Sequence, residues 1–103
     1  MQHAKYSLGQ IIHHRKFDYR GVIFDIDATF SGTEAWYEAV AKSKSPKDQP
    51  WYHVLVDNSQ QTTYVAERHL EATGSVLPIN HPLINHYFIN FIDGRYAHNN
   101  TNN

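Results

Sequence analysis

The chain has 103 residues with 9 Lys and Arg against 10 Asp and Glu, so its formal net charge is −1 at pH 7. This length fits one domain and excludes a multidomain enzyme, while 41% hydrophobic residues can build a core and exclude a disordered chain. Because the sequence has 0 Cys and shows no signal peptide or membrane span, we expect a protein of the reducing cytoplasm.

The first predicted unit is a β-hairpin. Alternate positions of residues 6–15 fall on one side of a strand, and residues 19–27 are rich in β-branched and aromatic side chains. The connection around 15–18 is too short for a parallel crossover. We therefore expect two antiparallel strands.

A short helix is predicted over residues 31–41. Ser31 and Glu34 have the spacing of a capping box, and apolar side chains follow at helical spacing. We expect this helix to cover the sheet as a lid. Residues 42–50 contain two prolines and alternating charges, which indicates a solvated loop within the domain.

The second half of the chain predicts another hairpin, from residues 51–56 and 62–66, followed by one helical turn at 67–70 and a short fifth strand at 76–79. A C-terminal helix is predicted from His81-Pro82 to Asp93-Gly94. Its apolar face would consist of Leu83, Ile84, Tyr87, Phe88, Phe91 and Ile92. We expect the polar residues 97–103 to be a disordered tail.

These elements predict a mainly β fold, a small, partly open SH3-like β-barrel of about five antiparallel strands with a short lid helix and a C-terminal helix. One domain would span residues 1–96. The apolar face of the C-terminal helix would either pack on its own barrel or join a second copy in a homo-oligomer.

Residues 22–29 end in Asp25-x-Asp27-x-Thr29, which is spelled like the nucleophile loop of haloacid-dehalogenase phosphatases. Those enzymes need a parallel doubly wound sheet, whereas this strand belongs to a hairpin, so we exclude that activity. The sequence also has no Gly-x-Ser-x-Gly elbow and no glycine-rich phosphate loop. We therefore predict no enzyme, no catalytic residues and no cofactor.

Asp25 and Asp27 stand at i and i+2, so both carboxylates should point to one face of the strand. They could bind a hard cation there, but the solvated face of an edge strand explains them more simply. The 8 histidines are not spaced to chelate a metal, so no metal site is predicted. We expect His53 to be half-buried and bonded to the backbone or to a neighbouring side chain.

Positive charge gathers at the first turn, in Arg15, Lys16 and Arg20. Such a turn can contact a few phosphates, although affinity for duplex DNA usually depends on many cations and the whole chain is at −1. The alternative is an ordinary solvated turn.

Several separated motifs resemble one family. They are Phe17-x-Tyr19-Arg20-Gly21-Val22-Ile23-Phe24-Asp25-x-Asp27, Thr33-Glu34-x-Trp36-Tyr37, Lys47-Asp48-Gln49-Pro50-Trp51-Tyr52-His53, Thr63-Tyr64-Val65-Ala66-Glu67, His81-Pro82-Leu83 and Asp93-Gly94-Arg95-Tyr96. In this order they resemble the YccV-like hemimethylated-DNA-binding family, also called the HspQ family. Ala28 replaces a frequent proline of the family, and Arg68-His69 replaces a frequent Gln-Asn.

The resemblance implies a heat shock protein of the bacterial cytoplasm that promotes degradation of damaged or regulatory proteins, the replication initiator among them. It implies a role as a substrate and specificity-enhancing partner of Lon protease, which is our first hypothesis. Binding of hemimethylated DNA in replication initiation is the alternative. We expect Lon or its clients to contact Asp25, Asp27, Trp51, Tyr52 and Glu67, and we expect DNA to contact Arg15, Lys16 and Arg20.

Overall fold

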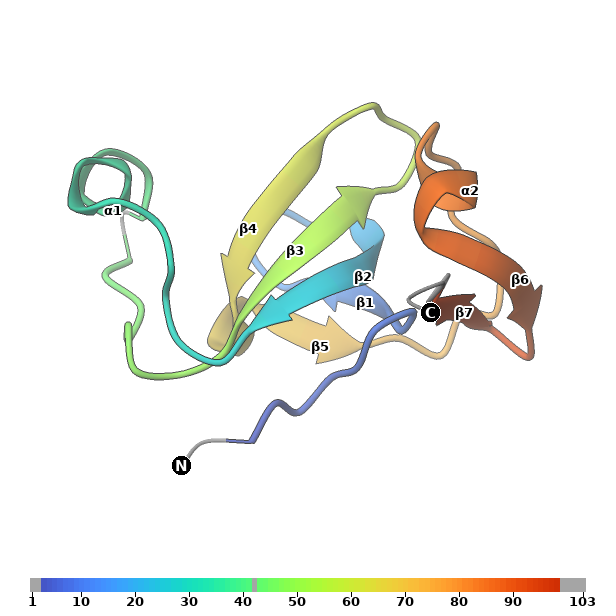
Figure 1. The fold of residues 1–103 in the computed structure, drawn as a ribbon, viewed down its shortest axis with the longest axis horizontal. Helices are drawn as coiled ribbons and strands as arrows, with labels where there is room; N and C mark the ends of the chain where they lie inside the picture. Colours follow the sequence, from blue (N-terminus) through green and yellow to red (C-terminus); the bar gives the residue numbers. More distant parts are fainter. Residues whose placement is uncertain (1–2, 42, 99–103) are drawn as a thin grey trace, which may run out of the picture.

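The computed structural model describes residues 3–41 and 43–98, which form two antiparallel sheets, two α-helices and one 3-10 turn (Figure 1). The larger sheet has the order β4-β3-β2-β1-β5 and consists of β1 (Ile11–His14), β2 (Arg20–Asp27), β3 (Trp51–Val56), β4 (Thr62–Ala66) and β5 (Leu70–Ala72). The smaller sheet pairs β6 (Phe88–Ile92) with β7 (Arg95–His98). The helices are α1 (Glu34–Val40) and α2 (Ile84–Tyr87), and η1 (Glu67–His69) is the 3-10 turn.

The larger sheet curls but does not close. The η1 turn carries the chain from β4 across to β5, which pairs with β1 rather than with β4. Strands β4 and β5 are therefore the two edges of an open sheet. The prediction of a mainly β, partly open fold is confirmed, and so are both predicted hairpins, with the second at its predicted bounds.

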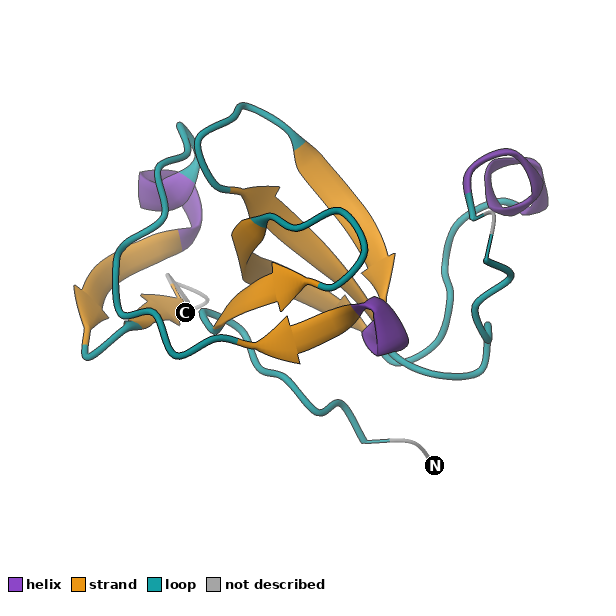
Figure 2. Ribbon diagram, turned by 180° about the vertical axis from the view of Figure 1, so that it is seen from behind, coloured by secondary structure: helices purple, strands orange, loops and turns teal. Residues whose placement is uncertain are grey.

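Both faces of the central strands are buried, so these strands contain consecutive apolar residues instead of a polar and apolar alternation. The inner face carries Ile12, Ile23, Tyr52, Val54, Val65 and Leu70. The outer face carries Ile11, Val22 and Leu55, packed against Ile79, Phe88 and Tyr96 from the C-terminal part. Seen from behind, segment 73–83 runs from β5 towards α2 and so brings the C-terminal hairpin to this outer face (Figure 2).

The first strand is shorter than the predicted 6–15. It begins at Ile11, because Gly9 has a φ of +82° and bends the chain before it. The Gly9 N–H donates to Ile23 O at 2.9 Å, and its carbonyl accepts from Tyr96 N–H at 2.9 Å. This glycine therefore fastens the N-terminal segment between β2 and β7.

Helix α1 differs from the prediction in its cap and in its position. Thr33, not Ser31, caps it, since Thr33 Oγ1 accepts from Trp36 N–H at 3.1 Å. The helix does not lie over the sheet as a lid but stands to the side of it, beyond the edge strand β4 (Figure 1). There Tyr37 packs with Trp51 and Ala66 in a small separate aromatic core.

The prediction of a C-terminal helix from residue 81 to residue 94 is wrong. Only the single turn α2 forms, and the chain then extends into β6. Asp93 and Gly94 both have positive φ, 55° and 78°, which is the conformation of a two-residue hairpin turn rather than a helix end. The fifth strand of the larger sheet is β5, and residues 76–79 form no strand.

Two further expectations depend on this hairpin. Ala97 and His98 belong to β7 and not to a disordered tail, whereas residues 99–103 lie outside the described residues. Four of the apolar residues predicted to cover a helix face pack against the protein's own outer core, namely Ile84, Tyr87, Phe88 and Phe91. In the described ranges, no helix is long and apolar enough to cross a membrane.

Candidate functional site

A β-bulge in β2 decides which side chains reach the outer face at its end. Ile23 pairs with Val54 and Asp25 pairs with His53, so Phe24 is an extra residue between the two pairs. Regular alternation would turn Asp25 into the inner core. The extra residue instead places Ile26 against that core and leaves Asp25 exposed, with Asp27 two residues further on.

The two carboxylates meet His53 and Tyr64 in a polar cluster. Asp27 Oδ2 accepts a hydrogen bond from the Tyr64 hydroxyl at 2.7 Å and lies 3.1 Å from His53 Nε2. Ligand atoms of Asp25, Asp27 and His53 all lie within 4.8 Å of one another. The predictions that the carboxylates share a face and that His53 is half-buried with a side-chain partner are confirmed.

Burial and the neighbouring Asp27 carboxylate raise the pKa of Tyr64 well above its ordinary value. The phenol therefore stays protonated at neutral pH and acts as a hydrogen-bond donor to Asp27. Its oxygen in turn accepts from Ser31 N–H at 2.9 Å, which ties the segment before α1 to β4.

Beside this cluster lies an open groove of about 460 Å³, bounded by β4, by the turn that joins β1 to β2, and by α1 with the segment that follows it. Its walls are rich in aromatic side chains and include Phe17, whose 68% exposure is the highest among the large hydrophobic side chains in the described ranges. The described lining residues include no carboxylate, and Lys16 is the cation among them. The other aromatic and imidazole side chains of the wall are Tyr19, Trp36, Trp51, Tyr64, His14, His53 and His69.

The unpaired edge of β4 faces the same groove. All five residues of β4 line it. Hydrogen-bonded and non-bonded residue pairs alternate along an antiparallel ladder. Val56 and Gln61 are a bonded pair, because Val56 N–H donates to Gln61 O. Counting along β4 from this pair, Thr63 and Val65 form the backbone hydrogen bonds to β3. In the described part of the chain, no hydrogen bond occupies the outward backbone groups of the alternate residues, which are Thr62, Tyr64 and Ala66.

Two stacked histidines form one end of the groove. The His14 and His69 rings lie 5.7 Å apart with an angle of 8° between their planes. His14 Nδ1 accepts the backbone N–H groups of Lys16 and Phe17, at 3.1 and 3.0 Å. Burial lowers the pKa of His14 to about 4, and burial also lowers the pKa of His69. Both rings are therefore neutral at neutral pH.

The five residues predicted to bind Lon or its clients do not share one surface. Asp25 and Asp27 lie in the outer polar cluster, and Trp51 is buried in the aromatic core beside it, at 2% exposure. Tyr52 points the opposite way into the inner core, where its hydroxyl donates to the Glu67 carboxylate. The structure thus brings Asp25 and Asp27 together and separates them from Tyr52 and Glu67.

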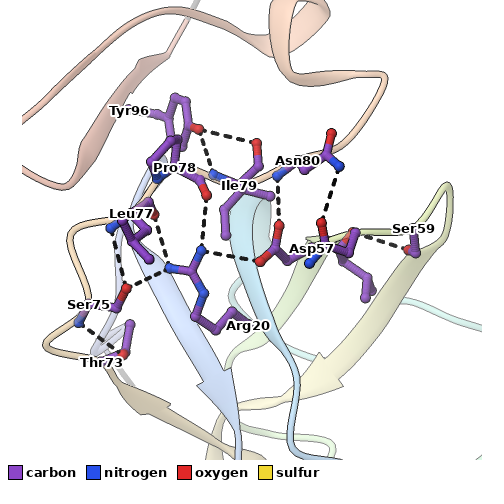
Figure 3. A network of polar contacts seen from close by, with 12 residues as sticks. Arg20, Asp57, Ser59, Thr73, Ser75, Leu77, Pro78, Ile79, Asn80 and Tyr96 are labelled. Carbon is purple, nitrogen blue, oxygen red and sulfur yellow. Dashed lines mark hydrogen bonds and ion pairs between the residues drawn. The ribbon is translucent and has the colours of Figure 1, made fainter.

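The three cations predicted to bind DNA are also separated. Arg15 and Lys16 are exposed on the first turn. The Arg20 guanidinium is instead enclosed by segment 75–78 and by Asp57 (Figure 3). It donates to Ser75 Oγ, Leu77 O, Pro78 O and Asp57 Oδ2, at 2.9, 3.0, 3.0 and 3.2 Å.

Sequence reasoning missed Phe17, His14 and His69 as parts of one groove. They come from the first turn and from η1, and the chain order gives no sign that these meet. An apolar Phe17 within a charged turn was the one local signal, because hairpin turns are usually polar.

The fold and the site define a small, mainly β domain with an aromatic groove, an open strand edge and a polar cluster at the end of β2. The family model described as hemimethylated DNA-binding protein YccV like matches residues 4–95. The chain therefore belongs to the YccV-like hemimethylated-DNA-binding family, which confirms the resemblance of its motifs.

Proposed function

We propose that this protein promotes ATP-dependent proteolysis as a specificity-enhancing partner and substrate of Lon protease in the cytoplasmic heat shock response. In this role it binds exposed segments of damaged or regulatory proteins, such as the replication initiator, and increases their degradation. The observation that supports this proposal is the aromatic groove beside the unpaired edge of β4.

The groove suits an extended, apolar stretch of polypeptide. A strand laid against β4 would satisfy the outward backbone groups of alternate residues, while apolar side chains would contact Phe17 and Trp36. Unfolded proteins expose such stretches and folded ones bury them. A protein that captures them can therefore select damaged clients without recognising one sequence.

The distribution of cations favours this function over tight binding of duplex DNA. Arg20 is committed to its own network, which leaves Arg15 and Lys16 of the three predicted phosphate contacts. These two remaining contacts, on a chain of net charge −1, support only weak and salt-sensitive binding. Hemimethylated-DNA binding, which the family's description names, remains the second candidate.

The test is to titrate the purified protein into Lon degrading an unfolded client in the presence of ATP. We expect faster client turnover with the natural protein and little acceleration with Phe17→Ser or Ala66→Pro. Ala66 has a φ of −69°, which proline adopts, and its N–H points away from β3, so this change blocks the edge without breaking the ladder.

The matched control is Val76→Ser, which changes an equally exposed apolar residue, at 65% exposure, outside the groove. It should accelerate turnover as the natural protein does. Unchanged turnover with the natural protein would overturn the proposal. In that case, a preference for hemimethylated over unmethylated duplex that is lost on replacing Arg15 and Lys16 with Glu would establish the second candidate. Sedimentation of the same samples tests the predicted homo-oligomer.

A further inference from the structure

We propose that Asp25, Asp27 and His53 form a binding site for one divalent transition-metal ion at the end of β2. This site borders the aromatic groove, with which it shares His53, and it does not depend on the proposed function. It departs from the sequence-based prediction of no metal site, which explained Asp25 and Asp27 as a solvated strand face and judged the histidines by their spacing along the chain.

The donors come from two neighbouring strands and converge on one point. Asp25 is the direct cross-strand partner of His53, and Asp27 follows two residues later on the same face. His53 Nε2 and Asp27 Oδ2 are 3.1 Å apart. Metal–ligand bonds to imidazole and carboxylate are about 2.0–2.2 Å long, so two atoms at this separation can both bind one ion. A metal ion would take the place of the direct contact between these two atoms.

The third donor needs only a side-chain rotation. All three ligand atoms lie within 4.8 Å of one another, and the Asp25 side chain is exposed. One Asp25 oxygen accepts from the Ile26 N–H at 2.9 Å, which leaves the other carboxylate oxygen for an ion. The β-bulge at Phe24 fixes this arrangement, because it places both carboxylates on the face of His53.

Hydrogen bonds from outside the proposed ligand set hold the Asp27 carboxylate in position. The Tyr64 hydroxyl donates to Asp27 and accepts from the Ser31 backbone. Metal-binding carboxylates are commonly oriented by such outer partners. Among residues 3–41 and 43–98, neither Asp25 nor Asp27 forms an ion pair with Lys or Arg, so an ion would supply the positive charge that this cluster lacks.

One side of the cluster is open. A surface hollow of about 470 Å³ adjoins it, lined by Asp27, His53 and Tyr64 and by the segment that leads into α1. Water molecules or an outside ligand can therefore complete the coordination shell. Two carboxylates and one imidazole favour ions such as Zn²⁺ and Mn²⁺ over Ca²⁺ and Mg²⁺, which prefer oxygen ligands alone.

A second histidine provides a contrast within the same chain. His13 also lies between two carboxylates, but Asp18 contacts its Nε2 at 2.6 Å and Glu71 contacts its Nδ1 at 2.8 Å. These carboxylates occupy opposite sides of the ring, so they cannot share one ion with a single nitrogen. This group has the same residue types without the convergence, and it supplies the control.

The test is to add Mn²⁺ at substoichiometric amounts to the chelator-treated, ¹⁵N-labelled protein and to follow amide signals. Because Mn²⁺ broadens nearby signals, we expect selective loss of the amides of residues 25–27 and 53. Isothermal titration with Zn²⁺ should give one site, weakened at least tenfold by Asp25→Asn or His53→Gln and unchanged by the control Asp18→Asn. Thermal melting of each variant checks that it is folded.

Broadening centred elsewhere, or Zn²⁺ affinity that is unchanged in the Asp25→Asn and His53→Gln variants, would overturn the proposal. Loss of affinity in both folded variants together with the selective broadening supports it. Neither result depends on Lon, so the outcome is separate from that of the degradation assay.

Discussion

Arg20 and Asp57 link the start of β2 to the turn after β3, with guanidinium Nη2 at 3.2 Å from carboxylate Oδ2. The same two residues are joined through the backbone, since Asp57 N–H donates to Arg20 O at 2.9 Å. Asp57 also accepts the Asn80 N–H at 2.7 Å. This pair thus fastens the segment that carries the C-terminal hairpin to the larger sheet.

Replacing Arg20 with Met should therefore lower the free energy of unfolding by about 2–4 kcal/mol, because a largely buried Asp57 carboxylate and two carbonyls lose their donor. Arg15→Met, at the exposed turn, should change it by less than about 0.5 kcal/mol. Urea unfolding measures both. Equal effects would show that the Arg20 network contributes no more than a surface residue.

Gly9→Ala should destabilise the protein by more than about 2 kcal/mol, because the left-handed φ of +82° and a Cβ only 1.9 Å from Tyr96 O both oppose a side chain. Gly74→Ala is the matched control. A Cβ at Gly74 has no neighbour within 4 Å, so this change should be neutral or slightly stabilising. Thermal melting of the two variants tests the prediction, and similar melting temperatures would contradict it.

Stability should depend on pH through His14. Its folded-state pKa of about 4 lies below the ordinary 6.5, so the unfolded chain binds a proton that the folded protein rejects. The free energy of unfolding should therefore fall as pH decreases from about 6.5 to 4, by an amount on the order of 3 kcal/mol at most. An NMR titration of the His14 ring checks the cause, and a midpoint near 6.5 would refute it.

His13 should have the opposite effect. Hydrogen bonds to Asp18 and Glu71 raise its pKa above 6.5, so the folded protein holds this proton more tightly than the unfolded chain. Its contribution is complete below pH 6.5 and is lost as pH rises through the folded-state pKa. Because Asp18 is highly exposed, the effect should stay below about 1 kcal/mol. Urea unfolding of the natural protein and of His13→Asn should differ at pH 6 and converge at pH 9.

Local signals predicted the central strands but misjudged the C-terminal part. Residues 51–56 and 62–66 are rich in β-branched and aromatic side chains, and they form strands at these bounds. The apolar residues of 84–92 have helical spacing, but the same positions fit one helical turn and an irregular strand. Asp93-Gly94 was the more specific signal, because a two-residue hairpin turn requires two positive φ angles and Asp-Gly adopts them readily.

The site was predictable only in part. The i, i+2 spacing of Asp25 and Asp27 correctly placed both carboxylates on one face. Trp51 and Tyr52 are neighbours in a strand, and strand alternation sends them to opposite faces, so they could not share one surface. The bulge at Phe24 and the meeting of the first turn with β4 depend on distant parts of the chain, which no short motif encodes.

The extra residue at Phe24 reverses which side chains of β2 face the inner core, so that the alternation before it differs from the alternation after it. Before it, β2 follows the periodicity of a strand buried on both sides, and after it the same strand presents carboxylates to solvent. Deleting one residue here would exchange interior for exterior along the rest of β2, placing Asp25 against the inner core. A loop has no such alternation of faces, so a change in chain length has this effect in β2 and not in a loop.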